Sequence, residues 1–233
     1  MASTAAAQAG PGPDKVRAVI ELFTSQGCSS CPPADTLLKT YVDRPGVLAL
    51  TLPVDYWDYL GWKDTYASAR NSERQRVYAR TRGDGAVYTP QAVVNGRLHA
   101  VGSSAKDIDK ALSRLGVASP LNVALDIRKE GSSLVIEAGA GAVGAGREGA
   151  TLWLALVQPE GVVPVKRGEN SGRTLTYTNI VREMTAVGMW SGEAVTIKLA
   201  ASDVMMPDTT ACAVILQQGN GGPILGAAWL KAP

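Results

Sequence analysis

The sequence has few of the side chains that most protein metal sites require. Its 233 residues include one histidine, His99, and three cysteines. Two of the cysteines, Cys28 and Cys31, form a C-x-x-C motif, and no second motif of this kind follows. Because a structural zinc site takes four ligands, Cys and His cannot supply such a site within this chain. We therefore expect no metal site of this type and no cofactor.

The sequence also lacks an excess of charge of either sign. Its 23 Lys and Arg residues and 21 Asp and Glu residues are spread along the chain and give a net charge of +2. Proteins that bind nucleic acid cluster Lys and Arg on one face or segment, so nucleic acid is not an expected partner. No apolar run reaches the roughly 20 residues that a membrane-spanning helix needs. We expect no membrane span.

The first 13 residues are rich in Ala, Gly and Pro and are predicted to be disordered. They have no basic start followed by an apolar stretch, so they are not an intact secretory signal, although they resemble the sequence that follows one. If the gene encodes a signal, the protein is periplasmic or secreted and meets an oxidising environment. Otherwise the C-x-x-C motif lies among cytosolic reductants.

The C-x-x-C motif follows a predicted buried strand, residues 16–23, and opens a predicted helix over residues 29–42. The free amide groups and the dipole at a helix N-terminus stabilise a thiolate, so we expect Cys28 to have a pKa below the value of about 8.5 for a free thiol. Cys31 is close enough to form a disulfide with it. We expect Cys28 to be the more exposed, attacking thiol and Cys31 to be the resolving thiol.

The rest of the first half predicts an α/β arrangement. The continuous apolar run 47–55 fits a second, parallel strand, and a polar covering helix is expected over 67–82. Asn95-Gly96 separates two strand-like runs and predicts an antiparallel hairpin, which a helix over 103–115 follows.

Beyond residue 117 the pattern changes from helices to short alternating runs. Strands are expected over 121–128, 133–137, 150–158, 162–166, 194–200, 210–217 and 224–230. Residues 174–184 fit either a long strand or a short helix. The sequence thus predicts an α/β domain over 14–117 and a separate, all-β, sandwich-like domain over 118–233. We expect the second domain to supply substrate contacts or the surface of a homodimer.

The order β-α-β, hairpin, helix is the arrangement of thioredoxin-like domains. Thr89-Pro90 begins the first strand of the predicted hairpin. In thioredoxin-like folds a cis proline at this point packs beside the cysteine pair, and neighbouring backbone groups bind a substrate peptide. We therefore expect Thr89 and Pro90 to lie opposite Cys28 and Cys31.

Four segments carry a resemblance to a known family: residues 20–35, 54–62, 88–91 and 168–175. Together they resemble the bacterial secreted thioredoxin-like proteins of the DUF1223 family. The resemblance implies a thioredoxin-like N-terminal domain, an appended β domain and export, and the family has no settled substrate. The sequence departs from thioredoxin itself at Gly27, which stands where thioredoxin has tryptophan, and at Ser29 and Ser30, which replace Gly-Pro. The redox potential of thioredoxin is therefore not carried over.

Other candidate residues surround the cysteines. Glu21 is either a buried carboxylate that shuttles a proton to Cys31, as an acidic residue on this strand does in thioredoxins, or a structural carboxylate, because its spacing from Cys28 is one residue longer. Asp55 and Trp57 follow the second strand and are expected to shape the rim of the site together with Ser29 and Ser30. Cys212, in an apolar strand-like run, is expected to be buried and inert.

These observations favour a thiol-disulfide oxidoreductase that acts on protein thiols or disulfides through Cys28 and Cys31. Two alternatives remain open from the sequence. The same cysteines suit a copper chaperone, since Cu(I) accepts two sulfur ligands. They also suit a binding module in which the disulfide is only structural.

Overall fold

The computed structural model describes residues 15–118, 121–142, 149–206 and 208–231. The predicted disordered segment 1–13 lies outside the described residues. The elements along the chain are β1 (Ala18–Thr24), α1 (Pro32–Val42), β2 (Val47–Pro53), the 3-10 helix η1 (Asp58–Leu60), α2 (Ala69–Arg82), β3 (Gln91–Val94), β4 (Leu98–Val101), α3 (Ala105–Ala118), β5 (Leu125–Glu130), β6 (Ser133–Ala138), β7 (Ala150–Pro164), β8 (Thr174–Trp190), β9 (Val195–Ala200), α4 (Ala201–Val204), β10 (Ala211–Gln218) and β11 (Ile224–Leu230).

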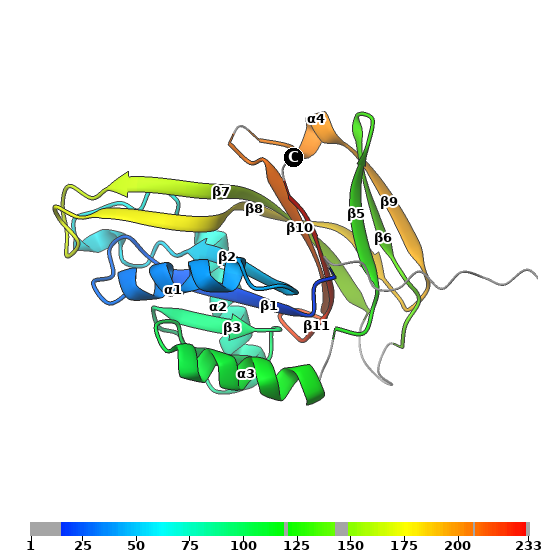
Figure 1. Ribbon diagram of the computed structural model, residues 1–233, viewed down its shortest axis with the longest axis horizontal. Coiled ribbons are helices and arrows are strands. Elements are labelled where there is room, and N and C mark those ends of the chain that lie inside the picture. Colours follow the sequence, from blue (N-terminus) through cyan, green and yellow to red (C-terminus); the bar gives the residue numbers. More distant parts are fainter. Residues whose placement is uncertain (1–14, 119–120, 143–148, 207, 232–233) are drawn as a thin grey trace, which may run out of the picture.

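The protein has a mixed α/β fold built on one eight-stranded sheet (Figure 1). The strand order is β11-β10-β7-β8-β2-β1-β3-β4. β1 and β2 pair in parallel around the crossover helix α1, and β3 and β4 form an antiparallel hairpin on the other side of β1. The predicted turn is confirmed, because Asn95 and Gly96 connect β3 to β4 with positive φ angles of 48° and 66°.

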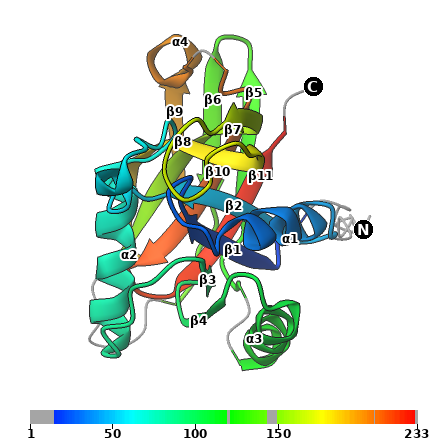
Figure 2. The same cartoon turned by 90° about the vertical axis from the view of Figure 1, so that its left-hand side faces the viewer.

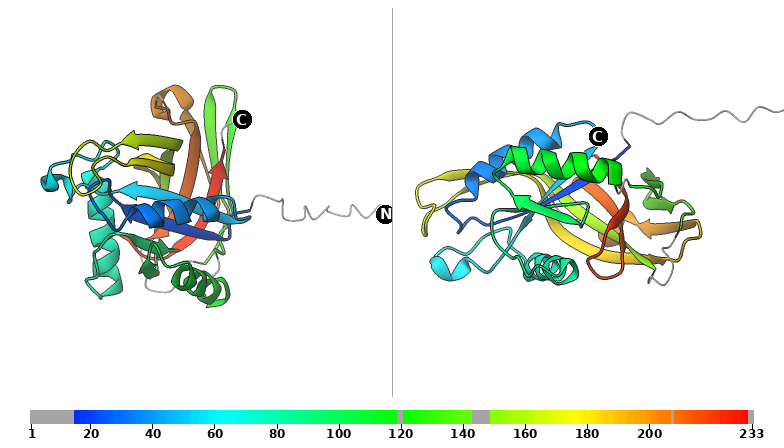
Figure 3. Two further views of the ribbon diagram at one scale, coloured as in Figure 1. Left: turned by 60° about the vertical axis from the view of Figure 1, so that its left-hand side comes forward. Right: turned by 90° about the horizontal axis from the view of Figure 1, so that it is seen from below.

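The helices of the first half lie on both faces of this sheet. Figures 2 and 3 show α1 and α3 on one face and α2 on the other. Alternation along β1 explains the packing: Ile20 and Leu22 point to the α1 face, where they contact Ala34, Leu38 and Tyr41. α1 is thereby fixed against the sheet with its N-terminal end at the carboxyl end of β1.

The described residues of the second half form strands and one short helix, α4. The region that fitted either a strand or a helix is the long strand β8, and the strands expected over 150–158 and 162–166 are one continuous strand, β7. β7 and β8 form a long hairpin. A second sheet, β5-β6-β9, packs against one face of β7 and β10 through the apolar side chains of Ile136, Leu154 and Val214.

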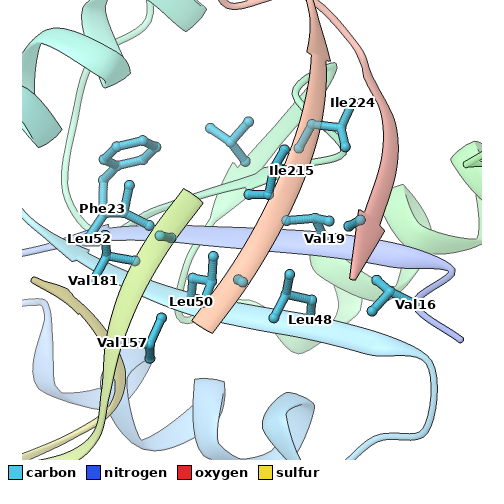
Figure 4. Packing of buried hydrophobic residues seen from close by; sticks show 14 of the residues in the cluster. Val16, Val19, Phe23, Leu48, Leu50, Leu52, Val157, Val181, Ile215 and Ile224 are labelled. Atoms are coloured by element: carbon cyan, nitrogen blue, oxygen red, sulfur yellow. The ribbon is translucent and has the colours of Figure 1, made fainter. Parts of the chain in front are cut away.

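The two halves share a hydrophobic core and one sheet. β2 pairs with β8 in parallel at Thr51 and Ile180, and the Thr51 hydroxyl donates to the Thr178 carbonyl at 2.6 Å. Figure 4 shows β10 crossing β1 and β2, with Ile215 packed among the buried residues of the first half. The predicted domain boundary at residues 117 and 118 therefore coincides with the end of α3. Strand pairing and hydrophobic packing join the segments on either side of this boundary.

In the described part of the chain, no helix has both the length and the apolar character needed to cross a membrane.

Candidate functional site

Cys28 and Cys31 form a disulfide at the start of α1. The helix begins at Pro32, so the expectation that it begins at residue 29 is wrong. Pro32 and Pro33 occupy its first two positions, where their missing amide hydrogens leave no intrahelical acceptor unpaired. Cys31 is the N-cap residue, and Cys28 lies in a turn before the helix, in which its amide donates to the Ser25 carbonyl at 3.1 Å.

The disulfide is buried. Cys28 is 2% exposed and Cys31 is 0% exposed, so Cys28 is the more exposed of the two only by this small margin. Ser29 and Ser30, between the two cysteines, are exposed. The Ser30 hydroxyl oxygen lies 3.4 Å from the Cys28 sulfur, where it is able to donate a hydrogen bond to a thiolate.

One wall of the site brings together several residues expected from the sequence. The Trp57 indole nitrogen donates to the Thr89 hydroxyl at 2.8 Å, and the Thr89–Pro90 peptide bond is cis. A Cβ atom on Gly27 would lie 3.0 Å from the Trp57 Cβ. Trp57 therefore packs where a side chain before Cys28 would stand, and it links the C-x-x-C turn to the Thr89–Pro90 segment.

Asp55 lies at the base of the same loop as Trp57. Its carboxylate accepts a hydrogen bond from the Ser72 hydroxyl of α2 at 2.5 Å, while the Asp55 amide lies 3.2 Å from the same oxygen. The Asp55 side chain therefore fixes the loop that carries Trp57 to α2.

A second set of contacts comes from the turn between β7 and β8, about 140 positions later in the chain. The Asn170 side-chain amide donates to the carbonyls of Gln26 and Cys28, at 2.9 Å each. Glu169 accepts a hydrogen bond from the Ser29 amide at 3.2 Å. In Figure 1 this turn lies at the same end of the molecule as the start of α1. Neither Glu169 nor Asn170 was predicted to belong to the site; their segment, which mixes opposite charges with two glycines, is typical of a tight loop.

A buried carboxylic acid, Asp35, lies one helical turn after Cys31. Its Oδ1 accepts a hydrogen bond from the Thr24 hydroxyl at 2.7 Å, and its Oδ2 has no hydrogen-bond partner among the described residues. Burial raises the pKa of Asp35 from 3.8 to about 8, against the opposing effect of the Thr24 hydrogen bond. The buried Tyr177 hydroxyl of β8 likewise has no partner in the described part of the chain. The only signal for Asp35 in the sequence is its position four residues after Cys31.

A second buried acid, Asp64, supports the turn that leads to the cysteines. Its carboxylate accepts hydrogen bonds from the amides of Gln26, Tyr66 and Ala67 at 2.8, 2.8 and 3.1 Å. Burial raises the pKa of Asp64 to about 6, although these three hydrogen bonds act in the opposite direction. Asp64 therefore serves as an acceptor that shapes the loop.

Glu21 is not brought to the cysteines. It points to the same side of β1 as Val19 and Phe23, away from α1. Its carboxylate is paired with the Arg74 Nε at 2.6 Å and with the Tyr78 hydroxyl. The geometry supports the structural alternative for Glu21.

A family model described as "Protein of unknown function (DUF1223)" matches residues 19–217. The chain belongs to the DUF1223 family. The match extends over both halves of the shared sheet, from β1 to β10. No protein with a curated description matches this DUF1223 chain.

Two solved structures are similar to the DUF1223 chain. The crystal structure of protein AGR_C_4864 from Agrobacterium tumefaciens is 39% identical, with a TM-score of 0.83, and the match covers 94% of this chain and 96% of that one. The structure of HBP35 of Porphyromonas gingivalis is 13% identical, with a TM-score of 0.65 over 95% of this chain and 77% of that one. The second likeness is one of fold alone.

The third cysteine of the DUF1223 chain lies far from the disulfide in sequence. Cys212 is 1% exposed on β10, and burial raises the pKa of its thiol to about 11. Its sulfur lies 3.6 Å from that of Met205. A buried thiol with a raised pKa is a poor nucleophile at neutral pH, as the sequence predicted. Within the described ranges no three His, Cys, Asp or Glu side chains are grouped as a metal site would require.

Proposed function

We propose that this DUF1223 protein is a thiol-disulfide oxidoreductase with a thioredoxin-like N-terminal half, acting on protein thiols or disulfides. The observation that carries the proposal is the Cys28–Cys31 disulfide at the start of α1, with Trp57 packed against Gly27, the residue before Cys28, and hydrogen-bonded to Thr89 of the cis Thr89–Pro90 pair. The β1-α1-β2 unit, the β3–β4 hairpin and α3 follow in the order that thioredoxin-like domains use.

The chemistry is an exchange of one disulfide for another. A substrate thiolate attacks the Cys28 sulfur, the Cys28–Cys31 bond breaks, and Cys31 leaves as a thiolate that takes up a proton. A second substrate thiolate then attacks the mixed disulfide and releases the Cys28 thiolate, so that the substrate is oxidised by two electrons and the protein is reduced. The reverse sequence reduces a substrate disulfide. The Ser30 hydroxyl, 3.4 Å from the Cys28 sulfur, stabilises the Cys28 thiolate in both directions.

Asp35 is the proton carrier that best suits Cys31. Residues four apart on a helix lie on the same face, and both side chains are buried. With its pKa raised to about 8 by burial, Asp35 carries a proton at neutral pH, which it donates as the Cys31 thiolate leaves. This assignment replaces Glu21, whose carboxylate is bound to Arg74.

A second candidate function is a binding module whose disulfide is structural. The burial of both cysteines favours this alternative, because disulfide exchange needs access to a sulfur atom. The two candidates differ in the stability of the disulfide toward reduction.

Equilibration with glutathione buffers tests the proposal. A Cys212→Ser background removes the third thiol, and Cys28→Ser in that background is the negative control. For an oxidoreductase we expect reversible reduction of the disulfide with a reduction potential above about −300 mV. A structural disulfide has a reduction potential below that value and is not reduced by glutathione. Disulfide exchange with a thiol peptide must also disappear in Cys28→Ser. Copper that is retained through purification and lost in Cys28→Ser would indicate the copper chaperone instead.

We also propose that the protein acts in the bacterial periplasm or outside the cell. A catalytic disulfide that oxidises substrates needs an oxidising environment, which the bacterial periplasm or the exterior provides. Locating the full gene product in fractionated cells tests this expectation.

A further inference from the structure

Cys28 is buried although the two residues that follow it are exposed. Ser29 and Ser30 face solvent, while Cys28 is 2% exposed. The turn between β7 and β8, residues 166–172, contacts the backbone of this loop, and we call it the cap. Asn170 in the cap is fully buried and donates to the carbonyls on either side of Gly27. The cap thus lies against the backbone that carries the reactive sulfur.

The base of the cap and its tip are held by different forces. At the base, Val163, Val165 and Leu175 pack in a buried apolar cluster with Trp62 and Tyr66. The Val165 amide donates to the Arg173 carbonyl at 2.9 Å, which closes the hairpin below the tip. The base is therefore anchored by apolar burial.

The tip is held to the disulfide loop by hydrogen bonds. They run from Asn170 to two backbone carbonyls and from the Ser29 amide to Glu169. Gly168 and Gly172, at φ angles of +76° and +81°, flank the tip. Apart from the close approach of Gly168 to Trp62, these contacts are polar, and water can take over the hydrogen bonds once the tip moves. Lifting the tip therefore leaves the apolar cluster at the base intact.

We infer that the cap regulates access to Cys28, with Asn170 as its latch. Attack on a disulfide requires a thiolate to approach the sulfur along the S–S bond, and Cys28 is only 2% exposed with the cap in this position. Lifting of the cap precedes exchange, and Asn170 is a positioning residue that acts through the backbone of Cys28. This inference rests on the proposed function for its biological meaning.

The rate of reduction by a small phosphine tests the cap independently of any protein substrate. Tris(2-carboxyethyl)phosphine cleaves the disulfide to two thiols and becomes the phosphine oxide, with its oxygen taken from water. In the Cys212→Ser background we expect Asn170→Ala to raise the pseudo-first-order rate of disulfide reduction about tenfold. This corresponds to about 1.4 kcal/mol less free energy holding the cap in place. Ser171→Ala is the matched control, since the Ser171 hydroxyl donates within the cap, to the Lys166 carbonyl, and its rate should stay within about twofold of the parent.

The two variants should be reduced equally fast in denaturant, which separates access from intrinsic reactivity. Equal native rates for Asn170→Ala and the parent would overturn the inference. Hydrogen exchange of the parent protein provides a second test if Asn170→Ala does not fold. We expect the Ser29 amide to exchange faster than the amides of β2. If both exchanged only through global unfolding, the inference would also be overturned. The glutathione equilibrium decides the proposed function separately, because a structural disulfide with a potential below −300 mV can still be capped.

Discussion

Two buried polar clusters lie on opposite faces of β1, and they differ in how completely their hydrogen bonds are paired. The Glu21 cluster consists of Glu21, Arg74, Tyr78 and Gln217, and the Asp35 cluster consists of Thr24, Asp35 and Tyr177. Glu21 points away from α1, whereas Thr24 shares the α1 face with Ile20 and Leu22. Both clusters join the first half of the chain to a strand of the second half.

The Glu21 cluster is a closed network. Arg74 donates to Glu21 at 2.6 Å, to Gln217 at 3.0 Å and to the Tyr78 hydroxyl at 2.7 Å. Gln217 in turn donates to the Tyr78 hydroxyl at 3.0 Å and to the Gly222 carbonyl at 2.8 Å. A buried charge that is paired in this way fixes the position of α2 and β10 against β1 and leaves little capacity for proton transfer.

The Asp35 cluster is open. Asp35 Oδ2 and the Tyr177 hydroxyl have no partner among the described residues, and only the Thr24 hydroxyl binds the carboxyl group. Buried polar groups are normally paired, and exceptions concentrate where a protein carries out chemistry. The contrast teaches that the unpaired buried polar groups lie in the cluster near the disulfide, which is the one that the proposed function uses, and not in the cluster around Glu21.

Removal of Arg74 should cause the largest loss of stability. Arg74→Met leaves the Glu21 carboxylate buried without its cation, and we expect the free energy of unfolding to fall by about 3–5 kcal/mol. Urea unfolding measures this difference. The double variant Glu21→Gln/Arg74→Met should lose less than the single variant, since it buries no charge. A loss below about 1 kcal/mol for Arg74→Met would mean that the network is not a structural unit.

Substitution of Asp35 should change the pH dependence of stability. Between the unfolded pKa of 3.8 and the folded pKa of about 8, the folded protein holds a proton that the unfolded chain has lost. Stability from this group is therefore full below pH 3.8 and falls by about 1.4 kcal/mol for each pH unit up to about 8. Asp35→Asn stays neutral, so the difference in unfolding free energy between variant and parent should grow with pH at that slope.

Denaturant titrations at intervals from pH 4 to pH 8 measure the effect of Asp35→Asn. Because the variant and the parent share all other ionisable groups, their difference isolates Asp35. A difference that does not change with pH would show that Asp35 is ionised in the folded protein, and the open cluster would then be no more reactive than the closed one.

Tyr78 belongs to the closed cluster, and loss of its hydroxyl should have an intermediate effect. Tyr78→Phe leaves Arg74, Gln217 and Glu21 each without one partner in a buried environment, and we expect it to cost about 1–3 kcal/mol. Thermal or urea unfolding at neutral pH checks the value. A neutral result would show that the hydrogen bonds of this cluster rearrange around the loss.

Tyr177→Phe is the matched substitution in the open cluster and should have the smallest effect. The hydroxyl that it removes has no partner in the described structure, so no hydrogen bond is lost. We expect a change within about 0.5 kcal/mol, or slight stabilisation, because the penalty of burying an unpaired polar group disappears. A loss comparable to that of Tyr78→Phe would remove the distinction between the two clusters.

The local elements of the fold were predictable because their signals lie within short segments. The strand β1, the helix α2 and the hairpin at Asn95-Gly96 follow from apolar runs, polar periodicity and turn residues. The pairing of β2 with β8 has no such signal. It joins Thr51 to Ile180, which are 129 positions apart in the sequence, and it forms only when both halves of the chain assemble into the shared sheet.

The site was predictable to a similar degree. The C-x-x-C motif, Trp57 and the Thr89–Pro90 pair were found from sequence, and the structure brings them together. The contacts of Asn170 and the burial of Asp35 were not, because both depend on β7 and β8 lying against the start of α1. The same assembly explains why Cys28 is covered although its sequence position suggested exposure.

The distance along the chain between Asn170 and Cys28 has a consequence for biosynthesis. They are separated by 142 positions, and ribosomes add about 5–20 residues per second. Translation therefore delivers both cysteines on the order of 10 s before the residue that comes to lie against them. In that interval the two cysteines of the nascent chain lack the contacts that Asn170 makes in the finished protein. A disulfide formed before Asn170 is synthesised and one formed after it therefore arise in different surroundings.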